Sequence, residues 1–207
     1  MRCPRCVQKI HRGAETCPRC GFALSCADAA FDQHPQLLPA LADRAGWLRL
    51  AERRRVQKAM DRFSTRFPDV FFAVYTGIFR DHESLRIAAF WLLNRVRFDN
   101  PDDIPNNSAV LLVIDVERKA ATMSYGYHLE PYLNEEDTFT CLSKAHQPWL
   151  EARYDAGIVA LIAALEKILM RKSRQAPRTG GSNPSWHVPG QDAGEDNHHN
   201  NGGEGTL

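Results

Sequence analysis

The sequence lacks any long apolar run, any excess of one charge and any internal repeat. No stretch approaches the roughly 20 apolar residues that a membrane-spanning helix needs, so we expect no membrane span. The 26 basic residues almost equal the 25 acidic ones, and the net charge is +1. This balance disfavours a role of the whole chain in binding nucleic acid or a membrane surface. Because the chain opens on arginine and cysteine rather than on an apolar signal segment, we expect a cytoplasmic protein.

Cysteine is scarce too, but four of the six cysteines form the pattern C-x2-C-x10-C-x2-C near the start of the chain: Cys3, Cys6, Cys17 and Cys20. Each two-residue gap lets both sulfurs turn toward one point, and two such knuckles supply a tetrahedral thiolate site for Zn2+. A reducing cytosol favours metal over disulfides, although the spacing does not separate zinc from iron. The sequence therefore predicts a structural zinc ribbon over residues 1–25, with Gly21 reversing the chain.

The ribbon is locally basic, but Phe22 is its only aromatic residue. Proteins that bind single-stranded nucleic acid usually offer several aromatic platforms for the bases. We therefore expect the ribbon to dock on a protein partner, and nucleic-acid binding through its basic side chains is the less favoured alternative.

The rest of the chain alternates helical and strand patterns. Apolar residues at helical spacing predict four helices, at residues 47–67, 83–97, 135–147 and 155–171. Three β-rich runs predict strands, at residues 70–76, 109–115 and 120–125. Strand, helix and strand imply a right-handed parallel crossover, and the third strand pairs antiparallel with the second. The fold class is thus α/β, a small mixed sheet sandwiched between helices.

Two segments are poor in such patterns. Residues 26–40 are predicted to be a linker between the ribbon and the α/β domain. Residues 173–207 are rich in Gly, Pro, Asn and Asp and poor in apolar side chains. Such a composition does not repay the entropy of folding, so the sequence predicts a disordered tail there.

Four local motifs, in this order and spacing, resemble the TPM-domain family over about residues 41–172. They are "LADRAGWL" from residue 41, "NNSAVLLVI" from 106, "SYGYHLEPYLNEE" from 124 and "YDAGIVALIAAL" from 154. The resemblance implies an α/β sandwich. Some members of the family are described as acid phosphatases, some bind calcium through acidic loops at one sheet edge, and others act as accessory proteins for membrane complexes.

The resemblance also implies a ligand or ion site at one edge of the sheet, but this chain departs from the family pattern there. Asn106 stands where relatives have Asp, and Arg153 also replaces an Asp. Ca2+ needs six to eight oxygen ligands, so the remaining carboxylates make a poor calcium site. We take the candidate edge site to comprise Asn106, Asn107, His128, Glu135, Arg153 and Asp155.

This set of residues has a second interpretation. Arg153 and the amides fit a phosphate or carboxylate, because a guanidinium fork matches such anions, and His128 is a candidate proton donor. Structural roles compete with this: Asp155 fits the N-cap of the last helix, and Glu135 fits a helix start.

The sequence thus predicts a binding or accessory role in which the ribbon contacts a protein partner. The alternative is an acid or metal-dependent phosphatase that uses the acidic edge. Catalytic residues are not identified, because no nucleophile and base are visibly paired.

Overall fold

The structure, a computed structural model, describes residues 2–11, 13–28, 31, 37–79, 84–100 and 104–175. All of them belong to one compact unit, Met1–Ala176. The predicted tail lies outside the described residues except at its start, where the last helix continues through Gln175.

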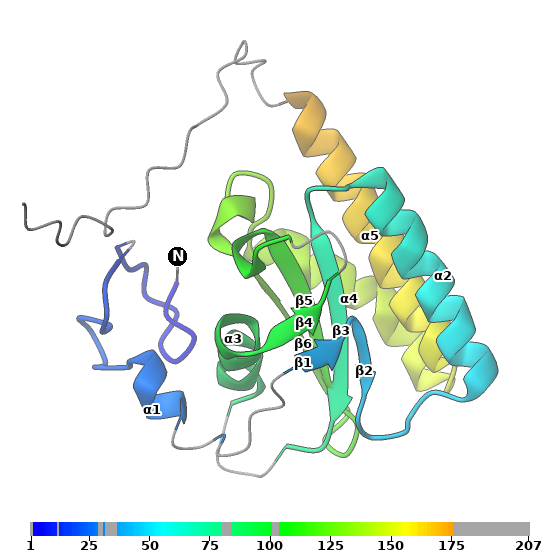
Figure 1. Ribbon diagram of the computed structural model, residues 1–207, viewed down its shortest axis with the longest axis horizontal. Coiled ribbons are helices and arrows are strands. Elements are labelled where there is room, and N and C mark those ends of the chain that lie inside the picture. Colours follow the sequence, from blue (N-terminus) through cyan, green and yellow to red (C-terminus); the bar gives the residue numbers. More distant parts are fainter. Residues whose placement is uncertain are drawn as a thin grey trace, which may run out of the picture. The chain divides into compact units, whose positions relative to one another are not determined.

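A four-stranded sheet in the order β2-β3-β5-β6 forms the centre of the α/β domain (Figure 1). Its strands are β2 (Leu41–Asp43), β3 (Phe71–Gly77), β5 (Ala109–Asp115) and β6 (Ala120–Tyr125). The first three strands are parallel, and β6 runs antiparallel to β5, as predicted. Every residue of β5 is buried, because a strand in the middle of a covered parallel sheet has apolar neighbours on both faces.

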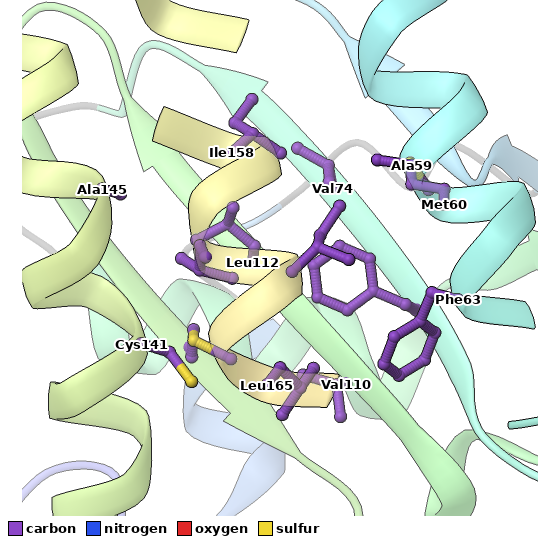
Figure 2. Packing of buried hydrophobic residues seen from close by; sticks show 14 of the residues in the cluster. Ala59, Met60, Phe63, Val74, Val110, Leu112, Cys141, Ala145, Ile158 and Leu165 are labelled. Atoms are coloured by element: carbon purple, nitrogen blue, oxygen red, sulfur yellow. The ribbon is translucent and has the colours of Figure 1, made fainter. Parts of the chain in front are cut away.

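Helices cover both faces of this sheet. Three helices, α2 (Leu50–Arg66), α4 (Glu135–Leu150) and α5 (Tyr154–Gln175), lie on one face, and α3 (Leu85–Arg95) lies on the other (Figure 1). Side chains alternate along β5, so that Val110 and Leu112 join the three-helix core while Leu111 joins the α3 core. Figure 2 shows Val110 and Leu112 packed among Phe63 of α2 and Leu165 of α5.

Several short elements complete the fold. Strands β1 (Leu37–Pro39) and β4 (Arg97–Asp99) form a separate two-stranded parallel sheet. Helix α1 (Leu24–Asp28) follows the ribbon, and the 3-10 turns η1 (Asn106–Ser108) and η2 (Tyr127–Leu129) flank the open end of the β5–β6 hairpin. The segment predicted as a linker therefore holds the end of α1 and all of β1.

The helix expected from residue 47 begins at Leu50 instead. The backbone N–H groups of Trp47 and Leu48 donate to the carboxylate of Asp43 at 2.9 and 3.0 Å, which fixes these residues as a loop. At Arg49 the backbone N–H donates to Glu52 Oε2 at 2.7 Å, as in a capping box. The cap therefore sets the first residue of α2, because apolar spacing alone does not define a helix end.

Candidate metal centre and edge sites

The ribbon consists of two matching knuckles. In the first, Val7 N–H donates to Cys3 O at 2.9 Å; in the second, Gly21 N–H donates to Cys17 O at the same distance. The residue after each second cysteine takes a positive φ, 62° at Val7 and 68° at Gly21. Gly21 behaves as predicted, and Val7 takes the same conformation although a β-branched side chain disfavours it.

The knuckles bring the four sulfur atoms together. The Sγ atoms of Cys3 and Cys20 lie 3.7 Å apart and those of Cys6 and Cys17 3.6 Å apart, and all four lie within 4.8 Å of one another. A tetrahedron with Zn–S bonds of about 2.3 Å places its sulfurs about 3.8 Å apart. The four cysteines are thus positioned to bind one metal ion, and the spacing of their sulfurs fits zinc.

The ribbon is packed against the α/β domain. Phe22 is buried, and its ring meets that of Phe90 on α3 edge-on, with centroids 6.1 Å apart. Cys3 and Cys17 belong to the same buried cluster as α3. At the end of α1, Asp28 accepts from Trp91 Nε1 at 2.9 Å and forms an ion pair with Arg95 at 2.6 Å. The metal-binding module is therefore part of the fold around α3.

A groove of about 480 Å3 lies where the ribbon meets the domain. We call it the ribbon groove. The ribbon lines it with Arg2, Cys3, Pro4 and Lys9, and α3 lines it with Arg86, Phe90, Leu93 and Asn94. The far side comes from η1, the end of β6, η2 and the start of α4, including Asn106, Asn107, Ser124, Tyr125, Glu130 and Glu135.

Three of the six residues predicted for the edge site line the ribbon groove: Asn106, Asn107 and Glu135. Asn106 has a structural role, since its side-chain amide donates to the carbonyls of Leu93 and Val96 at 2.8 and 3.1 Å. Glu135 forms an ion pair of 3.8 Å with Arg2 of the ribbon. The fourth residue, His128, lies nearby in η2, with Nδ1 3.0 Å from Ser108 Oγ.

The other two predicted residues, Arg153 and Asp155, lie near the opposite edge of the sheet, where the parallel strands end. Tyr154 stacks on Trp47, with ring centroids 4.1 Å apart, and Trp47 is bonded to Asp43 at the end of β2. The six residues predicted for the edge site thus lie in two separate places: four at or near the ribbon groove, and two near the carboxyl ends of the parallel strands. Arg153 forms an ion pair with Glu151 at 2.5 Å, and Asp155 lies in the first turn of α5 rather than at the N-cap.

At this second edge, which we call the carboxyl edge, three aspartates whose side chains have little or no exposure each have an arginine partner. Asp43 lies 3.6 Å from Arg53, Asp115 lies 3.2 Å from Arg118, and Asp155 lies 2.5 Å from Arg55. The hydrogen bond from Arg55 lowers the pKa of Asp155 below its ordinary value. Sequence reasoning missed all three pairs, including Asp115 and Arg118, which are only three positions apart. Arg55 and Asp155 are 100 positions apart, and no local pattern connects them.

The carboxyl edge does not fit the calcium ion that the family resemblance implies. A calcium site gathers several oxygen ligands around one point. Among the described residues, the four cysteines are the one group of metal-ligating side chains whose ligand atoms converge. The three arginines already neutralise the carboxylates, and a guanidinium beside a cation site opposes the ion.

The two remaining cysteines differ in their surroundings. Cys141 is fully buried on α4, and burial, followed by the nearby charge of Asp137, raises its pKa to about 12. Cys26 is exposed on α1. Within the described ranges, no helix combines the length and apolar character that crossing a membrane requires.

The comparisons with known proteins concern the α/β domain. Residues 41–168 match the TPM domain family. The chain is similar to the solution structure of the BA42 protein from the psychrophilic bacterium Bizionia argentinensis, with 12% identity, 60% of this chain and 83% of that chain covered, and a TM-score of 0.51. The chain is also similar to the N-terminal domain of a protein from P. gingivalis, with 21% identity, 63% of this chain and 81% of that chain covered, and a TM-score of 0.48.

No curated protein is significantly similar to the chain. The likeness to BA42 supports the α/β fold, and at 12% identity it concerns the fold alone. The family match covers more than half of the sequence and includes the sheet and the helices on both of its faces. The chain therefore belongs to the TPM domain family.

Proposed function

We propose that this chain is a cytoplasmic binding or accessory protein that holds a segment of a partner protein in the ribbon groove. One observation carries the proposal: the groove is built jointly by the metal-binding ribbon and the TPM domain. A concave site with aromatic walls and a few polar groups is the usual form of a binding pocket. Glu135, from the predicted edge site, lines the groove.

The metal in this proposal is structural zinc. About 24 residues cannot bury a core of their own, so metal binding supplies most of the free energy that folds such a module. Four thiolates keep a metal only while they are reduced, and the cytoplasm is a reducing compartment that keeps them so. Zinc thereby acts on binding indirectly, because it holds Arg2 and Lys9 at the groove wall.

The alternative of a phosphatase receives less support from the geometry. Catalysis requires a nucleophile, a base and anion-binding groups within reach of one substrate. The edge-site residues are divided between two edges, and Asp155 is already engaged by Arg55 at 2.5 Å. Arg153 is likewise engaged by Glu151.

Nucleic-acid binding through the ribbon is also less favoured. Phe22, the one aromatic ring that the ribbon offers, is 6% exposed and packs on α3. The guanidinium carbon of Arg5 lies 5.7 Å from the centroid of this ring. The Phe22 ring is therefore covered by side chains of the protein itself and does not serve as a stacking platform for a base.

Site-specific photocross-linking tests the proposal. A photoreactive amino acid replaces exposed Asn94 in the groove or, as a matched control, exposed Lys167 on α5. We expect one partner to be cross-linked in cells from position 94, not from position 167, and not after Cys6→Ser with Cys20→Ser. Equal capture from both positions would contradict the proposal. So would turnover of 4-nitrophenyl phosphate that Glu135→Gln or Asp155→Asn abolishes.

A further inference from the structure

Strand β6 forms one edge of the central sheet, and no further strand of the described residues pairs with its outer side. Gly126 N–H donates to Ala109 O at 2.9 Å. Ala109 and Gly126 are therefore a hydrogen-bonded pair of the antiparallel ladder between β5 and β6. In the register of the two strands, Leu111 pairs with Ser124 and Val113 with Thr122. Because hydrogen-bonded pairs alternate, the backbone N–H and C=O groups of Thr122 and Ser124 point toward β5. The backbone N–H and C=O groups of Ala121, Met123 and Tyr125 therefore point away from β5.

These outward groups have no backbone partner within the described part of the chain. Natural edge strands are usually protected by a charged residue, a proline or a bulge. Strand β6 reads "AATMSY" and has none of these over six residues, and its side chains are half-buried except that of Met123. An unprotected edge of this kind is a template for one more strand.

The C-terminal end of β6 lies at the ribbon groove. Met123, Ser124, Tyr125 and Gly126 line it. On the other walls Lys9 and Arg86 are exposed cations, and neither forms an ion pair with a described residue. Arg2 and Glu135 offset each other at 3.8 Å, and Glu130 places one further carboxylate on the far wall. The same groove therefore contains two cations and a row of backbone donors and acceptors that no described strand pairs.

We infer that the ribbon groove takes an extended peptide segment of a partner protein, which pairs with β6 as a fifth strand and carries an acidic residue beside Lys9 and Arg86. The inference rests on the proposed function and names the form of the partner. A peptide is favoured over a second copy of this chain because the ribbon and η2 line the same groove as the edge. A single strand needs less room between these walls than the edge of a whole domain.

The test selects peptides from a random nonapeptide phage library on the full, zinc-loaded chain. Each selected peptide is then resynthesised with one N-methyl group at each position in turn. Strand addition predicts that affinity falls about tenfold at every second position and little at the positions between, because alternate amides donate to β6. The exchange of the Ala121, Met123 and Tyr125 amides should slow in the complex, while those of Thr122 and Ser124 are protected already.

Two matched protein variants complete the test. Ala121→Pro removes one outward N–H and leaves the ladder to β5 intact, so it should weaken peptide binding about tenfold, whereas Ala121→Ser should not. Lys9→Ala with Arg86→Ala should weaken acidic peptides about fivefold at low salt and less at high salt.

The failures are distinguishable. Peptides that bind without the two-residue alternation would overturn strand addition but leave the groove as a binding site. If the chain forms a dimer and the Ala121→Pro variant is monomeric, the partner of β6 is a second copy of the chain. This result would overturn the inference that a peptide binds there. A library that yields no binder also overturns the inference, and it overturns the proposed function too if cross-linking from position 94 fails.

Discussion

Phe22 of the ribbon packs edge-on against Phe90 of α3, with the ring centroids 6.1 Å apart. The contact joins the four-cysteine ribbon to a helix that covers the sheet. Because Phe90 also lines the ribbon groove, the same contact connects the ribbon to the wall of the groove.

Phe22→Ala should release the ribbon from α3. The change removes a buried ring, which costs about 3 kcal/mol in a well-packed core. We expect a lower urea midpoint for the zinc-loaded chain and cleavage by protease in the residues before α1. Phe139→Ala, which removes a ring that is 71% exposed, serves as the control. An unchanged midpoint for Phe22→Ala would mean that the ribbon does not depend on this contact.

Val7→Gly should strengthen metal binding. Val7 has a φ of 62°, a conformation that costs a β-branched residue of order 1–3 kcal/mol. Glycine adopts it without strain but loses more chain entropy on folding, so we expect a net gain of about 1 kcal/mol, or about fivefold tighter zinc. Competition with a chromophoric chelator measures this.

Gly21→Val is the mirror experiment, because Gly21 takes the matching position with a φ of 68° and a Cβ there meets no atom within 4 Å. It should weaken zinc binding through backbone strain alone. Opposite signs for the two substitutions are expected, and equal signs would refute the strain argument.

Arg55→Ala should destabilise the chain at neutral pH but not in acid. Arg55 lowers the pKa of Asp155 through a hydrogen bond. The pair therefore stabilises the fold above the unfolded pKa of about 3.9, and this stabilisation disappears as pH falls through the lower folded pKa. The loss at pH 7 should be modest, since Arg55 is exposed and solvent screens the pair.

Urea unfolding at pH 7 and below pH 3 measures this dependence. Arg54→Ala provides the control, because Arg54 is exposed on the same helix and has no ion pair with a described residue. A loss that is equal at both pH values would rule out the Asp155 ion pair as its cause.

Calcium should not stabilise the chain. Asp43, Asp115 and Asp155 are each paired with an arginine, and their carboxylates do not converge on one point. Thermal unfolding with millimolar CaCl2 should give the same Tm as unfolding in a matched concentration of KCl. A rise in Tm that is specific to Ca2+ would show that the carboxyl edge holds the ion despite its arginines.

The sequence predicted those elements whose signal is local. Residues 109–115 form β5 with the predicted bounds, because a run of buried aliphatic residues between turns leaves one interpretation. Strand β2 was missed, since three residues carry no periodicity and form a strand only through the distant pairing of Leu41–Asp43 with β3. The sequence also did not show that the predicted edge-site residues lie at opposite ends of the strands. Their positions depend on the direction in which each strand runs in the sheet.

The four-cysteine cluster was predictable from spacing, but its position on α3 was not. Contacts such as Asp28 with Trp91 join residues 63 positions apart, and nothing in either local sequence indicates the other. The ribbon groove follows from this packing, so it too is a result of the three-dimensional structure.

The most direct test of the account compares nuclear magnetic resonance spectra of the full chain with zinc and after chelation. The Trp91 indole N–H donates to Asp28 at 2.9 Å, next to the ribbon, whereas that of Trp149 donates to Tyr154 O near the other edge. We predict that chelation shifts the Trp91 indole signal and the amides of α3 and Ser124, and leaves the Trp149 signal in place. An unchanged Trp91 signal in the metal-free chain would contradict the claim that the metal-folded ribbon builds the groove.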